Sequence, residues 1–236
     1  MKLVLYTFAA VFIFSSCQKE LSFEITPANG TGTGTGTGGA TSTDCKSCVY
    51  MPVCDGTWYT FADTLGTVAS IFTDTLRFSK DTTIDSKTFT KIYSPASKTY
   101  AYYNCTDGAT RLIQYNTTSL AGNTISKLDI TFLKANLAVG GKWQDMLTNP
   151  LGQQVIYTDS IVAKGISRTI NGKTFSDVIH VSVETGVNDS SIGGYFAFSV
   201  TDYYFAKGIG LIEALISYPS TGIVIEHRAI KSYYIP

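Results

Sequence analysis

A block of sequence motifs occurs twice in this chain, and the repeat restricts the folds that the chain can adopt. Three motifs recur in the same order: Gly56-Thr57-Trp58 as Gly141-Lys142-Trp143, Phe72–Leu76 as Tyr157–Ile161, and Thr83–Phe89 as Thr169–Phe175. Motifs that keep their order at a near-constant offset indicate a duplicated structural unit. We therefore expect two repeats, about residues 55–132 and 140–236, packed as one domain over residues 45–236.

The local patterns within each repeat are those of β-strands. Asn171-Gly172 lies between alternating apolar residues, a strong signal for a type I′ hairpin turn, and Asp85-Ser86 holds the equivalent place in the first repeat. Residues 128–132 and 179–183 also alternate. We expect residues 145–152 to form one helical turn at most. The prediction is an all-β, mainly antiparallel fold, either a strongly curved sheet or a two-sheet sandwich.

Residues 1–16 have the layout of a secretory signal peptide. Lys2 is followed by the apolar stretch Leu3–Phe14, which is too short to span a membrane. The closing Phe14-Ser15-Ser16-Cys17 resembles a lipobox, where bacterial lipoproteins are cleaved and acylated on the new N-terminal cysteine. The resemblance implies that Cys17 carries fatty acyl chains such as palmitate and that the membrane is a partner through this anchor. Gln18-Lys19-Glu20 resembles a surface-export signal of Bacteroidota, which implies the outer membrane and display at the cell surface, with a periplasm-facing anchor as the alternative.

Residues 17–44 connect the lipidated cysteine to the β domain. They contain Gly30–Gly39, in which Gly and Thr alternate, and no side chain there can bury enough surface to offset the entropy of ordering. We expect a disordered tether that, as a Gly-rich coil of about 25 residues, spans roughly 25–30 Å. That length holds a folded domain clear of the lipid headgroups.

Four cysteines remain besides Cys17, namely Cys45, Cys48, Cys54 and Cys105. An even number in an exported chain predicts two disulfides, whose pairing the sequence leaves open. A four-cysteine zinc site is the alternative because Cys45 and Cys48 have ligand-like spacing, although zinc ribbons usually carry a second close pair. A redox-active Cys-x-x-Cys is a third reading, although that motif normally begins a helix.

Composition narrows the function classes. The chain has 18 Lys plus Arg and 18 Asp plus Glu, so its net charge is zero and we expect no nucleic-acid partner. Gly208-x-Gly210 lacks the third glycine and the helix of a nucleotide-binding loop. The sequence predicts no cofactor and no metal.

Three segments are similar to a module that recurs in secreted Bacteroidota lipoproteins. They are Cys45–Gly56, Gly172–Val181 and Tyr203–Ile212. The resemblance covers most of the chain after Cys17 and implies location and fold. The group has no established activity, so the resemblance implies no chemistry.

Candidate catalytic side chains are scattered along the chain. His180 and His227 lie in predicted strands, where alternation turns them to the polar face. Two carboxylates could meet as a glycosidase pair, and the candidates are Asp177, Glu184, Glu213 and Glu226. No pattern selects a pair, so we name no catalytic residue.

Tyrosine doublets are candidates for a contact surface. Neighbouring side chains face opposite sides of a strand, so one member of Tyr102-Tyr103 and one of Tyr203-Tyr204 should be exposed. An exposed aromatic row can stack on sugars or contact a protein, and it can equally cover a sheet edge.

Four Asp-Ser/Thr pairs resemble the O-glycosylation acceptor of Bacteroidota. The acceptor hydroxyls would be those of Thr64, Thr75, Thr82 and Ser160, the third being followed by Thr83 where an aliphatic residue is usual. Asp74 and Asp159 are matched in the repeat, so a structural role for these carboxylates is the alternative.

These observations lead to one expected function and two alternatives. We expect a lipid-anchored binding or scaffold module for a glycan or protein partner. The first alternative is a hydrolase of surface polymers with paired carboxylates. The second is a carrier of lipid-like ligands, which an apolar cavity inside a curved sheet would indicate.

Overall fold

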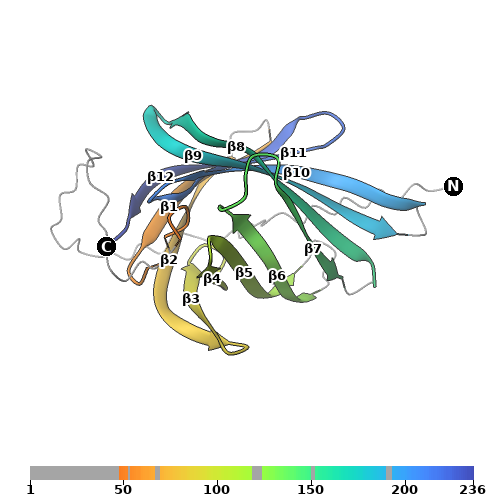
Figure 1. Cartoon of the computed structure of the whole chain (residues 1–236), viewed down its shortest axis with the longest axis horizontal. Coiled ribbons are helices and arrows are strands. Elements are labelled where there is room, and N and C mark those ends of the chain that lie inside the picture. The colour runs from red at the N-terminus through yellow and green to blue at the C-terminus, as the bar shows by residue number, and fades with distance from the viewer. Residues whose placement is uncertain (1–47, 53, 67–69, 119–123, 150–151, 190–192) are drawn as a thin grey trace.

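The protein is described by a computed structural model that covers residues 48–52, 54–66, 70–118, 124–149, 152–189 and 193–236 (Figure 1). The signal peptide, Cys17, the Gly/Thr tether and Cys45 lie outside these residues. The described part of the chain contains no helix that is long and apolar enough to cross a membrane.

Strands make up nearly all of the described chain. They are β1 (Trp58–Leu65), β2 (Ser70–Ile84), β3 (Lys87–Ser94), β4 (Thr99–Thr106), β5 (Ala109–Thr118), β6 (Thr124–Lys134), β7 (Lys142–Thr148), β8 (Gln154–Ile170), β9 (Lys173–Asp189), β10 (Gly194–Ala206), β11 (Gly210–Ser217) and β12 (Val224–Tyr234). Residues 142–148 are thus a strand, where the sequence left room for a helical turn.

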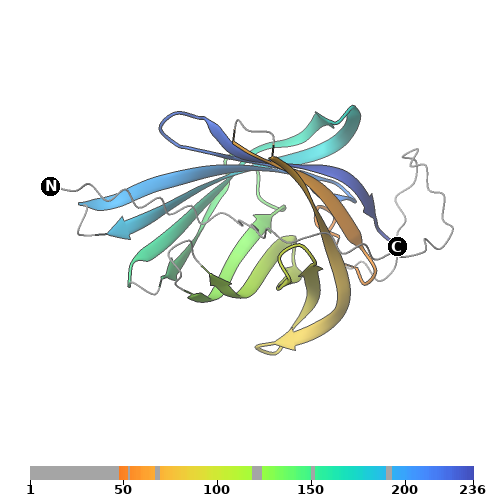
Figure 2. The same cartoon turned by 180° about the vertical axis from the view of Figure 1, so that it is seen from behind.

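The strands form a single antiparallel sheet in the order β6-β5-β4-β3-β2-β1-β12-β11-β10-β9-β8-β7. The sheet curls into a nearly closed barrel, as the two opposite views show (Figures 1 and 2). Side chains connect the two ends of the sheet: Trp143 Nε1 of β7 donates to the Thr131 carbonyl of β6, and the Thr131 amide donates to Asp145. The all-β prediction is confirmed, as a curved sheet and not as a two-sheet sandwich.

The sheet order supports the predicted duplication. Strands β7–β12 follow one another in the same spatial order as β1–β6, so the two halves lie side by side in one sheet. Both predicted hairpin turns are present and have left-handed backbone at both central residues. The φ angles are 49° and 63° at Asp85 and Ser86, and 50° and 78° at Asn171 and Gly172.

The two long hairpins also have equivalent contacts. The β2–β3 tip lies against β4 and β6, because Asn104 Nδ2 donates to the Thr88 carbonyl and Lys127 pairs with Asp85 at 3.3 Å. The β8–β9 tip lies against β12, because Asn171 Nδ2 donates to the Ile230 carbonyl. Each tip therefore reaches the last strand of its own half.

Side chains near these tips are buried as the repeat predicts. Phe89 is 1% exposed and Phe175 is 4% exposed. Their ladder positions also match, because Phe89 is opposite Thr82 and Phe175 is opposite Arg168. The phenylalanines of the third repeated motif are therefore buried at equivalent positions.

The two tryptophans do not occupy corresponding positions, which corrects the prediction for them. Trp143 pairs with Asp159, whereas the residue that pairs with Asp74 is Phe61 and not Trp58. The β1–β2 and β7–β8 ladders are therefore in different registers. Trp58 consequently points outward and is 36% exposed, whereas Trp143 is 7% exposed and joins the two ends of the sheet.

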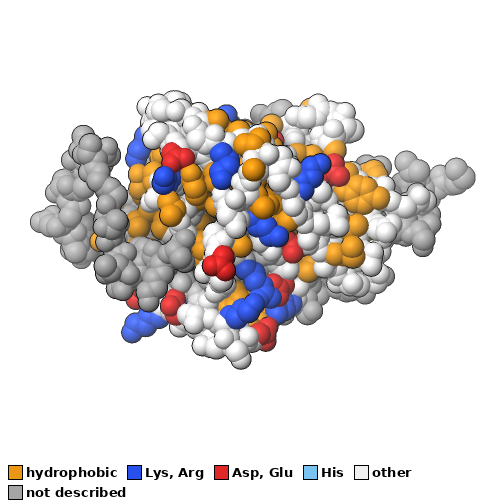
Figure 3. Space-filling view, in the orientation of Figure 1, with side chains coloured by type: hydrophobic (Ala, Val, Ile, Leu, Met, Phe, Trp, Pro, Cys, Tyr) orange, Lys and Arg blue, Asp and Glu red, His pale blue; other side chains and the backbone are white. Residues whose placement is uncertain are grey.

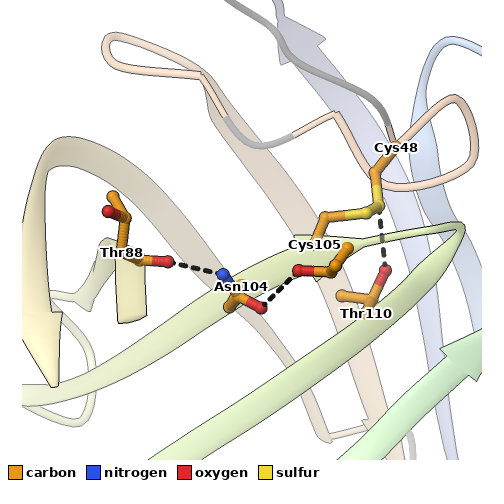
Figure 4. Close-up of a disulfide and its surroundings, with 6 residues drawn as sticks. Cys48, Thr88, Asn104, Cys105 and Thr110 are labelled. Atoms are coloured by element: carbon orange, nitrogen blue, oxygen red, sulfur yellow. Dashed lines mark hydrogen bonds between the residues drawn. A yellow bond between two sulfur atoms is a disulfide. The ribbon is translucent and has the colours of Figure 1, made fainter. Parts of the chain in front are cut away.

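Residues 48–52 and 54–57, which precede β1, contact both halves of the curled sheet. The disulfide Cys48–Cys105 joins this segment to β4, with the Cα atoms 6.0 Å apart (Figure 4). Tyr50 Oη donates to Asp177 of β9 at 2.6 Å, and the Gly208 amide donates to the Val49 carbonyl. The segment thus contacts strands of both halves.

This bridge confirms one of the two predicted disulfides. Cys54 is also disulfide-bonded, and Cys45 lies outside the described residues. Because Cys48 and Cys105 are bonded to each other, neither thiolate is available for the four-cysteine zinc site that was the alternative.

Candidate functional site

A cavity of about 110 Å³ lies inside the curled sheet. Its lining side chains come from alternate positions of the strands, since every second residue of a strand points inward. Most of the lining is apolar, and Met51 of the segment before β1 is part of it. The polar and charged side chains of the lining include Ser94, Gln114, Thr201, Glu226 and Arg228.

Arg228 of β12 contacts two buried acidic side chains in this interior. Its Nε donates to Asp63 Oδ1 at 2.7 Å and its Nη2 donates to Asp63 Oδ2 at 2.9 Å. The two residues are directly opposite in the β1–β12 ladder, so strand pairing itself brings them together. Asp74 Oδ2 of β2 lies 3.8 Å from Arg228 Nη2, and Ser94 Oγ donates to Asp74 Oδ1 at 2.9 Å.

Glu226 lies two residues before Arg228 and therefore on the same inward face. Its side chain is buried, and Oε2 accepts no hydrogen bond within the described part of the chain. Burial raises the pKa of Glu226 to about 7; Arg228 lowers it and Asp63 raises it further. Burial likewise raises the pKa of Asp74, against the lowering effect of Ser94 and Arg228. The cluster therefore has three carboxyl groups and one guanidinium.

A fourth buried carboxyl lies in the second half of the sheet. Asp159 of β8 is opposite Trp143, and its Oδ2 lacks a hydrogen-bond partner among the residues that the structure describes. Burial raises the pKa of Asp159 to about 8, the nearby charge of Asp145 raises it further, and Lys134 lowers it. Among the described residues, the cation that acts on Asp159 is Lys134, whereas Arg228 acts on Asp74.

Both histidines lie on the outer face, as alternation predicts, and belong to an ordered network there. His180 Nε2 is 2.8 Å from Asp202 Oδ1, and the Tyr204 ring stacks on the imidazole at 4.5 Å. Arg168 of β8 lies over Tyr204 and donates to Glu213 at 2.6 Å. His227 Nε2 is 2.8 Å from Glu213 Oε1. Since Arg168 lies on the β8–β9 hairpin, this network holds the hairpin against β10 and β11.

The four carboxylates proposed as glycosidase candidates are not brought together. Asp177 pairs with Tyr50 and Lys207, and Glu184 accepts from Tyr195. Glu213 belongs to the outer network described above, so within this set it is Glu226 that lines the cavity.

The acids that do accompany Glu226 are Asp63 and Asp74, which are not among the carboxylates that the sequence pattern suggested as catalytic. Both are fully buried, with 0% of their surface exposed. A signal existed in the sequence: Asp74 and Asp159 are matched in the repeat. In a strand, an Asp that recurs at the same place of a duplicated unit is a candidate inward-facing carboxyl.

The four tyrosines proposed as a contact surface do not form one row. Tyr103 and Tyr203 point inward and line the cavity, and burial raises the pKa of both. Tyr204 is on the outer face but is covered by Arg168. Tyr102 points outward and contacts Tyr115, with ring centroids 5.9 Å apart.

The outer face is mixed in character. Figure 3 shows basic, acidic and apolar side chains interspersed over one side of the molecule. Tyr100 is exposed, stacks with Tyr93 at 4.9 Å and lies under Lys91. One exposed aromatic group therefore lies on β3–β5 and includes Tyr102 of the predicted set, and further exposed aromatic side chains lie on β1, β10 and β12.

The candidate O-glycosylation hydroxyls are all in strands. Thr64, Thr75, Thr82 and Ser160 are partly buried, and the neighbouring Asp63, Asp74 and Asp159 have their carboxyls inside the sheet. Asp63 and Asp74 have hydrogen-bond partners inside the sheet, which supports the structural alternative for these two residues, and modification stays a prediction.

No family model matches the chain, and no curated protein matches it. Among solved structures, the fold is similar to a Bacteroides fragilis protein described as exported, with a YmcC-like fold. The TM-score is 0.50 at 10% identity, covering 80% of this chain and 100% of that chain. It is also similar to a protein from Parabacteroides distasonis described as a lipoprotein, with a TM-score of 0.50, 11% identity and the same coverage. At these identities the likeness shows a shared fold.

Proposed function

We propose that this protein is a lipid-anchored envelope lipoprotein whose β domain binds a small, partly apolar molecule inside its sheet. One observation carries the proposal: a cavity with a mainly apolar lining also contains acceptor atoms that have no partner among the described residues, at Gln114 and Glu226. Binding sites for small molecules have this composition, an apolar wall with a few convergent polar groups.

The location is proposed from the N-terminus and from the neighbours. The segment before Cys17 has the layout of a lipoprotein signal. The two similar structures are described as an exported protein and as a lipoprotein, which supports the same compartment. Replacement of Cys17 by Ala tests the anchor, because it should move the protein from the membrane fraction to the soluble fraction. Membrane retention of the Cys17→Ala protein would refute the anchor.

The size of the cavity favours a small ligand over a polymer. A cavity of roughly 150 Å³ is needed for a molecule as small as benzene, and this one measures about 110 Å³. A sugar unit of a chain is larger than benzene and therefore exceeds this volume. A binding role is therefore better supported than hydrolysis of a surface polymer by these carboxyls.

Filling the cavity tests the binding role. Ala101 lines the cavity, and Ala101→Leu places three additional carbons in it, whereas Ala138→Leu adds the same atoms at an exposed loop position. We expect n-butanol to give saturable NMR shifts of cavity methyl groups in the wild type and in Ala138→Leu, and none in Ala101→Leu. Equal saturation in all three proteins would refute the cavity as the site.

A further inference from the structure

The charges around the cavity restrict the ligand further, an argument that rests on the function proposed above. The Arg228 guanidinium donates two hydrogen bonds to the Asp63 carboxylate, at 2.7 and 2.9 Å. That pair is neutral as a whole. The remaining groups of the cluster, Asp74 and Glu226, are both acidic, so the site has an excess of negative charge over positive charge whenever they ionise.

The unpartnered atoms of this region are all hydrogen-bond acceptors. Glu226 Oε2, Asp74 Oδ2 and Gln114 Oε1 are buried and accept no hydrogen bond within the described ranges of the chain. Glu226 is 6% exposed and Gln114 is 3% exposed, and both line the cavity. A buried acceptor without a donor is costly, so a bound molecule that supplies donors relieves this cost.

An ammonium group meets both requirements. It carries a positive charge and three donors and has no acceptor. A carboxylate or phosphate ligand would bring more acceptors and negative charge to a site whose arginine is already paired. A hydroxyl brings a single donor and no charge, so it satisfies the site less completely.

The rest of the lining suits a short alkyl chain. Leu76, Ile92 and Ile216 border the same cavity as Glu226. The volume of about 110 Å³ compares with roughly 150 Å³ for a cavity that holds benzene, so about five non-hydrogen atoms fit. n-Butylammonium has this size.

We infer that the cavity binds an alkylammonium group, with Glu226 as its counter-ion and the apolar side chains around its carbon chain. The group is either a free small amine or the end of a longer amine. Both sources share the same chemistry at Glu226, and chain length distinguishes them.

Binding should depend on pH in a defined direction. The groups that face Glu226 are Arg228 on its own strand, Asp63 on β1 and, beyond Arg228, Asp74 on β2. Because burial raises the pKa of Glu226 to about 7, the side chain is mostly protonated at pH 5.5 and mostly ionised at pH 8. A cation binds the ionised form, so affinity should rise with pH and fall by up to about tenfold for each unit below 7.

The test compares three probes of similar size by NMR titration at pH 8: n-butylammonium, n-butanol and n-butyrate. We expect n-butylammonium to bind about tenfold or more tightly than n-butanol, and n-butyrate not to bind. Glu226→Gln should remove the preference for the cation. Glu184→Gln, which neutralises an acid on the outer face, should leave it unchanged.

The outcomes separate this inference from the binding role itself. If n-butanol and n-butylammonium bind equally and Glu226→Gln has no effect, the cationic class is refuted and the binding role stands. If no probe binds and only ordered water donates hydrogen bonds to the buried acceptors, the cationic class and the binding role are both refuted. Among amines, tighter binding with each carbon beyond four supports the end of a longer amine, and weaker binding supports a free small amine.

Discussion

Replacing Arg228 by Met tests the central feature of the interior. The substitution removes both donors to Asp63, which is fully buried, and the 3.8 Å contact with Asp74. Removal of one partner of a buried ion pair typically costs about 3–5 kcal/mol, because the other charge is left buried and uncompensated. We expect Arg228→Met to lower the free energy of unfolding by that amount at pH 7, measured by urea denaturation with tryptophan fluorescence.

The stability that Arg228→Met loses should depend on pH. Arg228 lowers the pKa of Asp74 and of Glu226, so its removal raises both further above their unfolded values. A carboxyl whose folded pKa is raised stabilises the protein at low pH and loses this contribution as pH rises through the folded pKa. The variant should therefore lose stability more steeply than the wild type as pH rises through 7, and its deficit should be smaller at pH 5 than at pH 8.

A matched control lies on the outer face. Arg111 makes the same bidentate contact with Asp129, at 2.6 Å for each bond, but both side chains are partly exposed. Exposed pairs contribute about 0–1 kcal/mol, so Arg111→Met should cost little at either pH. A cost below about 1 kcal/mol for Arg228→Met at pH 7, or a cost equal to that of Arg111→Met, would show that the interior pair is hydrated and would refute the reasoning.

Three further predictions follow from the fold. Removing the Cys48–Cys105 bridge, whose residues are 57 positions apart, should destabilise the domain by about 4 kcal/mol in the chain-entropy model, as a Cys48→Ser, Cys105→Ser protein would show in urea. Phe89→Ala and Phe175→Ala should each cost about 3–5 kcal/mol by the same assay, and unequal costs would count against equivalent halves. Because the folded pKa of Asp159 is raised to about 8, Asp159→Asn should match the wild type near pH 4 and exceed its stability by about 3–5 kcal/mol at pH 8; parallel pH profiles would contradict this.

The hairpins could be predicted from sequence because their chemistry is local. A type I′ turn needs left-handed backbone at two adjacent residues. Asn-Gly is a preferred pair for this conformation, and Asn171 and Gly172 both adopt it. Asp85-Ser86 is weaker turn chemistry, yet its place in the repeat was enough to predict the same turn. The period-2 alternation likewise predicted strands at 128–132 and 179–183.

Register was predicted poorly because it depends on partners far away in the chain. Trp58 and Trp143 share a Gly-x-Trp motif, but the strand ladder places Phe61 opposite Asp74 and Trp143 opposite Asp159. A shift by an odd number of residues turns a side chain to the other face of a sheet. The sequence around either tryptophan contains no local pattern that predicts this difference in register.

The interior cluster could not be assembled from sequence for a similar reason. Arg228 and Asp63 are 165 residues apart and meet because β12, the last strand, pairs with β1, the first. Asp63 and Asp74 each precede a Thr, so the sequence pattern suggested acceptors for glycosylation. Their inward orientation follows from the strand period, but their common partner follows only from the pairing of β12 with β1.

The two halves of the interior have therefore diverged although the strand order is shared. Asp74 and Asp159 are matched in the repeat, but Asp74 lies 3.8 Å from Arg228, whereas Asp159 faces the charge of Asp145. Burial is the largest cause of the raised pKa at both acids, and the remaining difference between their pKa values comes from the charges nearby. A ligand pocket that requires an ionised acid can be maintained beside Arg228, because the guanidinium lowers the cost of ionising Asp74 and Glu226. Among the described residues, the cation that lowers the pKa of Asp159 is Lys134, and Asp159 is not among the residues that line the cavity, so the proposed cation site lies at Glu226 and not at the matched acid of the second repeat.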